Sequence, residues 1–432
     1  VGTLSLYFAA VFKQAELFGS YFKNPLIALL NLAPVLLLAL GLYFLTGRPG
    51  LAYGLTAGLT AGFTMGNWFK LQFRNDPLLF EDLLLLKEAG NMAGKYQLFL
   101  SRTMALALAL LLLENGHEVT LWSYTEEESR VLRETRENPM LKGVPLPETM
   151  GLTTDMGAVK GCGAVVMATP SFAVRATAAK LKQLADPGTI VISVSKGIEK
   201  DTSLRLSQVI EEELQGHCPV VVLSGPSHAE EVGRHVPTGV VAASEDLELA
   251  RQVQDLFMNP RFRVYTSTDK VGTELCAALK NIIALCAGCC DGMGCGDNTK
   301  ALLMTRGLAE MARLGVALGG KQETFAGLAG VGDLIVTCCS MHSRNRRAGI
   351  LIGQGKTPEE AMTQVGAVVE GYYAARSAHL LATRLGADLP ITAAAYRVLY
   401  QGADVAWTVN QLLCRDKRAE TEDASWDAQW NM

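Results

Sequence analysis

The chain has 432 residues, which is enough for two or three domains with a large core. Hydrophobic residues make up 49% of the sequence and charged residues only 19%, and the apolar excess is concentrated before about residue 70. The formal net charge of −4 excludes the general basic surface with which proteins bind nucleic acid non-specifically, so we expect no nucleic-acid function.

Two long apolar segments lie near the start of the chain, which begins at Val1 and is compatible with a fragment of a longer protein. Residues 26–45 and 51–69 carry no charge, and the turn-forming residues 46–50 join them. Each segment is long enough to span a bilayer, and a buried helical hairpin is the alternative interpretation. Because they lack a short apolar stretch with a cleavage site, we do not interpret them as a signal peptide.

Basic residues flank this apolar pair. Lys13 and Lys23 precede it, and Lys70 and Arg74 follow it, whereas Arg48 is the one charge between the two segments. The positive-inside rule therefore predicts that both flanks lie in the cytoplasm.

The same region resembles the membrane part of lipoteichoic acid synthase-like proteins of the sulfatase superfamily. The resemblance covers about residues 1–104 and is carried by NPLIALLNLAPVLLLALGLYFLTGR and FKLQFRNDPLLFEDLLLLKEAGNMAGKY. In that family further spans and an extracellular metal-dependent catalytic domain follow. Neither is present here, so the resemblance implies no phosphotransfer activity. The family topology would also place the stretch after Phe69 outside the cell, which conflicts with the charge pattern.

Short apolar segments alternate with helix-length segments after about residue 96. This alternation is typical of an α/β domain with a mostly parallel sheet and helices on both faces. From about Val271 onward the strands stop and amphipathic helices predict an all-helical domain. We predict strands at residues 118–122, 164–168, 189–194 and 219–223. We divide the chain into a membrane-type helical segment (1–96), the α/β domain (97–270), the all-helical domain (271–415) and a charged tail (416–432).

Three loops follow predicted strands, at the edge where such sheets bind ligands. They are residues 168–171, residues 195–199 with Lys196 beside a glycine, and residues 224–231. In the third loop Ser227 and Glu230 fit a capping box, whose free amide groups could receive an anion. Each of these signals is weak alone, because a capping box is usually only a helix cap.

Lys280 is the residue around which we place the chemistry. At helical spacing its neighbours are small and apolar, so we expect desolvation to lower its pKa and to make it a proton donor or acceptor near neutral pH. The alternative is a lysine that extends to the surface beside Asn281.

The helical domain adds a carboxylate and a cluster of donors. Asp333 lies in the glycine turn GVGDL, and Ser343, Arg344 and Asn345 provide groups suited to a phosphate. The alternative for the second cluster is a solvent-exposed basic turn. Residues 368–371 form one further acidic turn.

All ten cysteines follow residue 160, in apolar helical runs, which predicts buried thiols in a reducing compartment and no disulfide framework. A metal site at the closely spaced Cys286, Cys289, Cys290 and Cys295 is the alternative. It lacks the second paired CxxC that would make it specific, so we expect no metal.

Seven motifs then carry a more specific resemblance. From about residue 107 to about 415, SKGIE, SGPSHAEEV, LKNIIA, TRGLAEM, GVGDL, SRNRR and VVEGY occur in the order typical of bacterial NAD(P)-dependent glycerol-3-phosphate dehydrogenases. The resemblance implies a Rossmann-like domain followed by an all-α domain, NAD or NADP as cofactor, and dihydroxyacetone phosphate and glycerol 3-phosphate as substrates. It is compatible with a homodimer.

The resemblance also implies roles for matching residues. Lys280 corresponds to the general acid/base. The implied glycerol phosphate contacts are Lys196, Gly225, Ser227, Lys280, Asp333, Ser343, Arg344 and Asn345. The implied cofactor contacts are Lys196, Ala229, Arg344, Val368 and Glu370. No acidic residue stands where an NAD ribose contact is expected, so the resemblance indicates no preference between the two nicotinamides.

One departure from the family affects the cofactor. The family has a strand, G-x-G-x-x-G and a helix, and here the helix is present as ALALLLLENGHEV at residues 107–119. The three glycine positions hold Leu100, Arg102 and Ala105, so the fingerprint that binds the dinucleotide phosphates is absent. The upstream letters KYQLFLSRTM continue the membrane-type segment, which places the junction of two unlike sequences here.

Two hypotheses follow. The first is an oxidoreductase that reduces dihydroxyacetone phosphate to sn-glycerol 3-phosphate for glycerophospholipid synthesis, with a cytoplasmic catalytic part attached to the membrane through residues 26–69. The second is a chimeric or membrane-tethered protein that binds glycerol phosphate but is catalytically impaired because the cofactor loop is missing.

Overall fold

The computed structural model describes residues 36–40, 42–52, 55–57, 102–138, 141, 143–200, 202–417 and 420. The chain forms two compact units, Val1–Tyr96 and Gln97–Met432. In the first unit a helix ends at Thr46, Gly47 has a φ of +63°, and helix resumes at Pro49, so the break lies inside the predicted turn. Most of the two predicted membrane spans lies outside the described residues.

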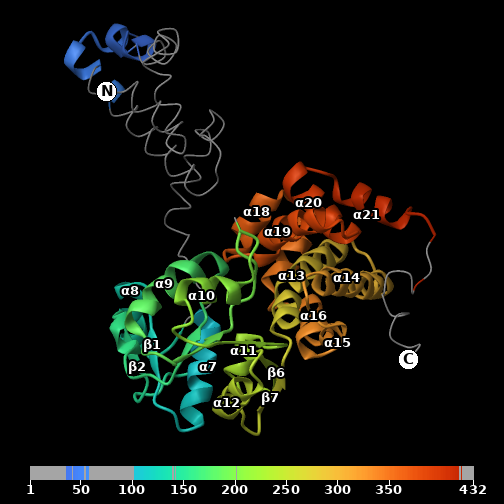
Figure 1. Ribbon diagram of the computed structural model, residues 1–432. Coiled ribbons are helices and arrows are strands. Elements are labelled where there is room, and N and C mark those ends of the chain that lie inside the picture. Colours follow the sequence, from blue (N-terminus) through green and yellow to red (C-terminus); the bar gives the residue numbers. More distant parts are fainter. Residues whose placement is uncertain are drawn as a thin grey trace. The chain divides into compact units, whose positions relative to one another are not determined.

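The second unit begins with a lobe in which strands and helices alternate (Figure 1). Its strands are β1 (Thr120–Trp122), β2 (Gly151–Thr153), β3 (Ala164–Met167), β4 (Ile190–Ser193), β5 (Val220–Ser224), β6 (Thr238–Ala243) and β7 (Phe262–Ser267). β1 and β2 pair in parallel, and the other five form a sheet in the order β3-β4-β5-β6-β7, in which only β5 and β6 are antiparallel. Among the described residues no hydrogen bond pairs β1 with β3, so the lobe has two separate sheets.

Helices cover both faces of the larger sheet. The lobe contains α7 (Arg102–Glu114), α8 (Glu126–Thr135), α9 (Val174–Leu184), α10 (Leu206–Leu214), α11 (Ala229–Val232) and α12 (Leu247–Phe257), with short 3₁₀ turns at Met156–Val159 and Ser171–Ala173. Successive side chains of β4 point to opposite faces. Ile190 and Ile192 pack in a core with α7 and α12, and Val191 packs in another core with α9 and α10. This two-sided burial explains why β4 and β5 are continuous apolar runs.

The four predicted strands are present with ends shifted by one or two residues, but β2, β6 and β7 were not predicted. β6 begins with threonine and glycine, so its apolar run is limited to residues 240–243, and the side chains of β7 alternate between buried and exposed. The helix expected at residues 107–119 starts earlier, at Arg102, and ends at Glu114. Gly116 follows with a φ of +87°, which ends the helix before the strand.

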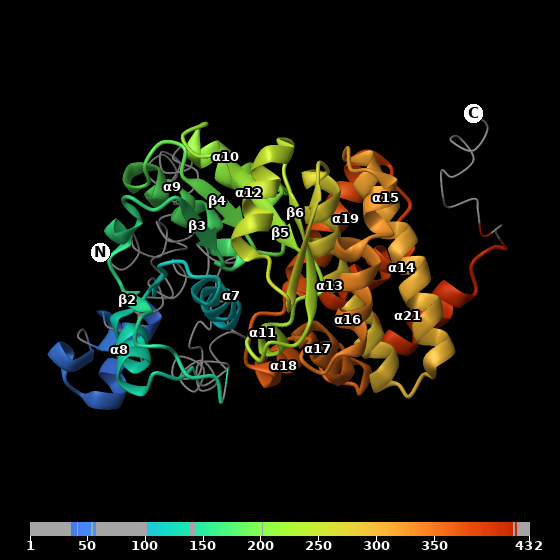
Figure 2. The same ribbon diagram turned by 90° about the horizontal axis from the view of Figure 1, so that it is seen from below.

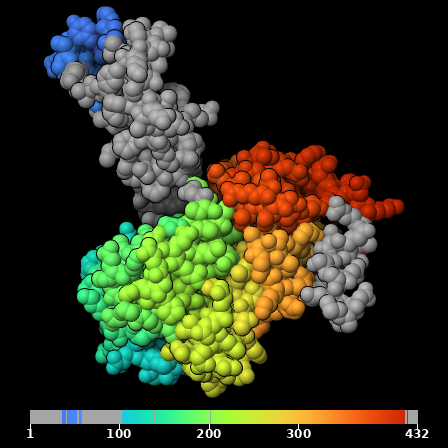
Figure 3. Space-filling model, in the orientation of Figure 1, coloured from blue at the N-terminus to red at the C-terminus, as the bar shows by residue number. Residues whose placement is uncertain are grey.

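The second lobe is all helical and is organised around α13 (Figure 2). It contains α13 (Lys270–Gly292), α14 (Asp297–Ala317), α15 (Gln322–Phe325), a π turn (Leu328–Gly332), α16 (Asp333–Cys339), α17 (Arg344–Gly353), α18 (Pro358–Val365), α19 (Glu370–Leu385), α20 (Pro390–Gln401) and α21 (Val405–Leu413). In Figure 3 the green and yellow atoms of the first lobe and the orange and red atoms of the second form one continuous surface.

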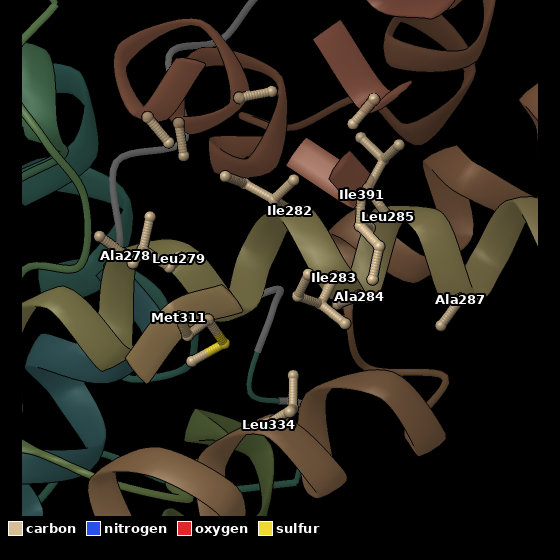
Figure 4. Close-up of a cluster of buried hydrophobic side chains, with 14 of the residues drawn as sticks. Ala278, Leu279, Ile282, Ile283, Ala284, Leu285, Ala287, Met311, Leu334 and Ile391 are labelled. Carbon is tan, nitrogen blue, oxygen red and sulfur yellow. The ribbon is translucent and has the colours of Figure 1, made fainter. Parts of the chain in front are cut away.

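The helix α13 is long and apolar enough to cross a membrane, but 83% of its apolar window is buried inside the protein. Figure 4 shows why: Ile282 and Leu285 pack on one side of the helix, and Met311 and Leu334 lie on another. Glycines bring α17 against it. A Cβ at Gly288 would overlap the Arg346 carbonyl oxygen, and one at Gly349 would overlap the Leu285 carbonyl oxygen. The two backbones therefore touch directly, which fixes α17 and its first turn relative to α13.

Candidate active site

Lys280 lies in the middle of α13 and is only 5% exposed. Its Nζ donates to Asp333 Oδ1 at 2.5 Å and to Thr337 Oγ1 at 2.7 Å. The alternative interpretation of a lysine extending to the surface is therefore wrong. Burial lowers the pKa of Lys280 to about 8, although the Asp333 carboxylate opposes that shift. Lys280 can therefore give or take a proton close to neutral pH.

Asp333 is the first residue of α16 and is shared by two lysines. Its other oxygen, Oδ2, accepts from Lys196 Nζ at 2.8 Å, and the residue is 1% exposed. Burial alone would raise the pKa of Asp333, but the charges of Lys196 and Lys280 outweigh it and hold that pKa below its usual value. One buried carboxylate thus fixes two ammonium groups, one from each lobe, and leaves a net positive charge for an anionic ligand.

Gly225 connects the third predicted loop to the same cluster. Its carbonyl oxygen accepts from Lys196 Nζ at 2.9 Å and from Ser227 Oγ at 3.1 Å. Gly225 has a φ of +149°, and a Cβ there would lie 2.9 Å from Val240 Cα, so a side chain would force the loop away from β6. The loop therefore needs glycine to present this carbonyl to Lys196.

The predicted capping box at Ser227 and Glu230 is wrong. The short helix α11 begins at Ala229, its N-cap is His228, and no side chain caps it. The Ser227 hydroxyl bonds back to Gly225 instead, because the chain has not yet entered the helix at that residue.

A second group of predicted residues lies at the first turns of α17 and α19. Ser343 is the N-cap of α17 and accepts from Arg346 N at 3.2 Å. Asn345 donates to Asn281 Oδ1 at 2.9 Å and accepts from Gly371 N at 2.8 Å, so it ties three helices together. The polar groups of Ser343 and Asn345 that make these bonds therefore already stabilise the helices, although both residues were predicted to contact the substrate.

Arg344 and Glu370 are the charged members of this second group. Burial lowers the pKa of Arg344, and the charges of Glu370 and Glu230 oppose that shift. Arg344 is half-buried and Arg347 is exposed, so the alternative of a solvent-exposed basic turn applies to only part of this segment. Glu370 Oε2 accepts from Ser171 Oγ at 2.9 Å, across the junction between the two lobes, and burial raises the pKa of Glu370. Ala229 is buried in the first turn of α11, and Val368 is partly buried just before α19.

Three residues that contribute to this region were not predicted individually, although two of them, Ser171 and His228, lie in the predicted loops 168–171 and 224–231. Thr337 stands one turn after Asp333 and could have been found from that spacing on a helix. Ser171, which binds Glu370, follows a predicted strand but carries no signal of its partner 199 residues away. His228 lies between Ser227 and Ala229, with its ring centroid 5.9 Å from that of His342.

The cysteines, which were considered as a possible metal site, are not grouped as metal ligands in the structure. The structure gives all ten as free thiols, and burial raises the pKa of Cys289 to about 12 and of Cys290 to about 11. In the described part of the chain, no group of three or more His, Cys, Asp or Glu side chains could hold a metal ion.

The end of the site that would hold the nicotinamide ring and the end that would hold the pyrophosphate differ in how well they fit a dinucleotide. Thr169 Oγ1 and Ser224 Oγ, at the carboxyl ends of β3 and β5, are buried and have no hydrogen-bond partner among the described residues, as suits the amide of a nicotinamide ring. Arg102 and Ala105, by contrast, are already part of α7, and neither provides the glycine that close approach of a pyrophosphate needs. Leu100 lies outside the described residues.

Comparison with known proteins decides the family. Residues 105–250 match the model described as NAD-dependent glycerol-3-phosphate dehydrogenase N-terminus, and residues 269–410 match the corresponding C-terminus. The glycerol-3-phosphate dehydrogenase [NAD(P)+] of Moorella thermoacetica is 55% identical over 322 residues, which are 74% of this chain and 96% of the relative. That of Desulfitobacterium hafniense is 52% identical over 320 residues, which are 74% of this chain and 91% of the relative. The chain belongs to the NAD-dependent glycerol-3-phosphate dehydrogenase family.

Solved structures agree with this family membership. The crystal structure of glycerol-3-phosphate dehydrogenase from Coxiella burnetii is 38% identical, with a TM-score of 0.68, and the match covers 72% of this chain and 96% of that one. The enzyme from Saccharomyces cerevisiae is 27% identical, with a TM-score of 0.63 and the same coverage. The Rossmann-like lobe and the helical lobe expected from the sequence are therefore those of the family.

Neither family match includes residues before 105. The resemblance of residues 1–104 to lipoteichoic acid synthase-like proteins thus finds no support in these comparisons. The family match also begins just after the first two glycine positions, Leu100 and Arg102, which agrees with a change of sequence type at this junction.

Proposed function

We propose that this chain is an NAD(P)-dependent sn-glycerol-3-phosphate dehydrogenase that reduces dihydroxyacetone phosphate to glycerol 3-phosphate, a precursor of glycerophospholipids. The observation that carries the proposal is the buried array of Lys280, Asp333 and Lys196 at the junction of the lobes. The similarity to relatives named as this enzyme over more than 90% of their length supports it over a protein that only binds glycerol phosphate.

The chemistry assigned to Lys280 follows from its position and pKa. When bound, a nicotinamide cofactor supplies the hydride that adds to the ketone carbon. Negative charge then develops on the ketone oxygen, and the Lys280 ammonium is the group that we expect to protonate it. Asp333 and Thr337 hold Nζ in place, so the proton is presented from a fixed position.

We expect the positive charges that Asp333 does not neutralise to bind the phosphate. Asp333 neutralises only one of the two lysines, so the site attracts an anion before any ligand arrives. Arg344 presents a planar guanidinium that suits a phosphate, and the charges of Glu370 and Glu230 act on it. We therefore assign the phosphate to the Arg344 side of the site and the reacting carbon to the Lys280 side.

The test is a nicotinamide absorbance assay on the purified full chain, with NADH and NADPH, in both reaction directions. We expect turnover of dihydroxyacetone phosphate and of glycerol 3-phosphate. Calorimetry with glycerol 3-phosphate and with NADPH accompanies the assay. Substrate binding without turnover or nicotinamide binding would support the impaired-protein alternative instead, and a folded protein that binds neither would refute both.

We further propose that the catalytic unit is cytoplasmic and attached to the membrane through residues 26–69. The two uncharged stretches and the basic residues around them support this proposal. Expression of the full chain and of a variant that lacks residues 1–96, followed by membrane fractionation, tests it. The full chain should sediment with membranes and resist a high-salt wash, and recovery of both proteins in the soluble fraction would exclude the attachment.

A further inference from the structure

His228 lies between the two polar groups of the site. It follows Ser227, whose hydroxyl belongs to the cluster of Lys196 and Gly225. Its ring faces that of His342 at a centroid distance of 5.9 Å, and His342 directly precedes Ser343 at the start of α17. The charges of Lys280 and Lys196 also act on this ring, so the imidazole lies near the lysine cluster and near the start of α17, on the expected course of a ligand that extends from Lys280 toward Arg344.

The two ring nitrogens of His228 have different surroundings. The Val336 backbone, on the same helix as Asp333, raises the pKa of the ring, as a carbonyl oxygen facing a ring N–H group does. Nε2 is buried and has no partner among the described residues. We therefore assign the hydrogen of the neutral ring to Nδ1, on the side of the Val336 carbonyl oxygen. With its one hydrogen on Nδ1, a neutral imidazole exposes a lone pair on Nε2, which is then an acceptor that requires a donor.

The charge around the ring favours this neutral form. Burial lowers the pKa of His228, and the ammonium groups of Lys280 and Lys196 lower it further, against the weaker effect of Glu230. Protonation would add a third positive charge beside the two lysines. Nε2 therefore stays an acceptor at the pH at which the substrate binds, and a buried acceptor left without a donor destabilises the complex.

The ligand contains one group that suits this acceptor, if the proposed function is correct. A phosphate dianion only accepts hydrogen bonds, and the oxygen on the reacting carbon pairs with Lys280. The terminal hydroxyl of dihydroxyacetone phosphate or glycerol 3-phosphate is then the remaining donor. We propose that His228 Nε2 accepts a hydrogen bond from this terminal hydroxyl and thereby makes the site specific for a three-carbon phosphate ester that carries it.

Two substitutions separate this role from a structural one. His228→Asn keeps an amide N–H near the position of Nδ1, where it can still donate to Val336, but it removes the group at Nε2. His228→Gln places its amide near the position of Nε2 and so keeps an acceptor there. A merely structural role predicts that Asn is the milder change, whereas the proposed role predicts that Gln is.

Calorimetry on the full chain provides the measurement, since it requires neither cofactor nor turnover. The ligands are glycerol 3-phosphate and 1,2-propanediol 1-phosphate, which lacks only the terminal hydroxyl, with inorganic phosphate as a control for the anion site. We expect the unaltered chain to prefer glycerol 3-phosphate at least about tenfold, because an unpaired buried acceptor penalises the analogue. In His228→Asn the preference should fall to about twofold or less, with affinity for the analogue and for phosphate little changed. In His228→Gln a preference of at least about threefold should remain.

Each other outcome points to a different failure. Equal loss of both esters in His228→Asn, or an unaltered chain that binds both esters equally, would overturn the assignment of His228 and leave the proposed function intact. A folded chain that binds phosphate but neither ester, or none of the three, would overturn the proposed function and this inference together.

Discussion

The substrate side and the cofactor side of this site are built very differently. On the substrate side, Lys280, Asp333 and Lys196 come from both lobes and are joined by hydrogen bonds of 2.5 and 2.8 Å in a buried setting. On the cofactor side, the helix that should follow a glycine turn begins at Arg102, and the two sheets of the lobe are not hydrogen-bonded to each other through described residues. The proposed acid/base group, Lys280, is thus held in place independently of the elements that would hold the dinucleotide phosphates.

This difference separates two properties that are usually tested together. In the proposed function, the preorganised charge of Lys280 acts on the ketone oxygen whatever holds the cofactor. Cofactor affinity depends on a close approach of backbone to pyrophosphate, which we expect side chains at the three glycine positions to prevent. Variants should therefore affect turnover and nicotinamide binding separately.

The largest effect should come from Lys280→Met, which removes the proton donor and keeps the apolar stem. We expect turnover to fall at least a hundredfold, within the range of about 10² to 10⁴ typical of acid/base groups, with little loss of substrate binding. Steady-state kinetics and calorimetry measure the two properties, with Lys356→Met at an exposed position as the matched control. If Lys280→Met stays active, Lys280 is structural.

Gly288→Ala probes the packing that positions the substrate side. Its new Cβ would overlap the Arg346 carbonyl oxygen, so α13 and α17 must move apart, at a cost of about 1–3 kcal/mol in the free energy of unfolding. Chemical denaturation measures this cost against Gly163→Ala, where a Cβ would meet nothing within 4 Å. Equal stability of the two variants would mean that the helix crossing is not as close as described.

Restoring glycine at Leu100, Arg102 and Ala105 should raise nicotinamide affinity at least tenfold. The first glycine permits a tight turn, the second lets the pyrophosphate approach, and the third allows helix and strand to pack. Fluorescence titration with NADPH measures the change, and glycerol 3-phosphate affinity should stay the same. If the unaltered chain already binds NADPH at micromolar levels, our alignment of these three positions is wrong.

The pH dependence gives the smallest and most specific effect. Because ketone reduction needs protonated Lys280 and burial lowers its pKa to about 8, kcat/KM for reduction should be level below pH 8 and fall about tenfold per pH unit above it. Oxidation of glycerol 3-phosphate needs the neutral amine, so it should rise up to about pH 8 and then level off. Profiles that bend in the same sense for both directions would assign the ionisation to another group.

The sequence predicted those parts of the fold and site whose signals are local. β4 and β5 are continuous apolar runs buried on both faces, and the apolar surroundings of Lys280 are visible at helical spacing. The partners of Lys280 were not visible in this way. Asp333 is 53 residues away and Ser171 is 199 residues from Glu370, so only the folded chain brings these groups together.

Local rules also failed where tertiary contacts compete with them. Ser227 has the spacing of a capping residue, but its hydroxyl is used by the Gly225 carbonyl in the loop that Lys196 holds. The four residues of α11 are too few for a cap to dominate the local energy. The proposed role of His228, next to Ser227, was not visible in the sequence. It rests on the surroundings of the two ring nitrogens, which only the folded chain reveals.

The small parallel sheet of β1 and β2 has a consequence for how the protein opens. Its residues share a minor core with α7 and α8, apart from the large core around α13. Regions with few buried contacts open at lower free energy than the global unfolding transition. Amide hydrogens of β1 and β2 should therefore exchange with solvent well before those of α13, so a protease or a chaperone would meet this corner of the protein first.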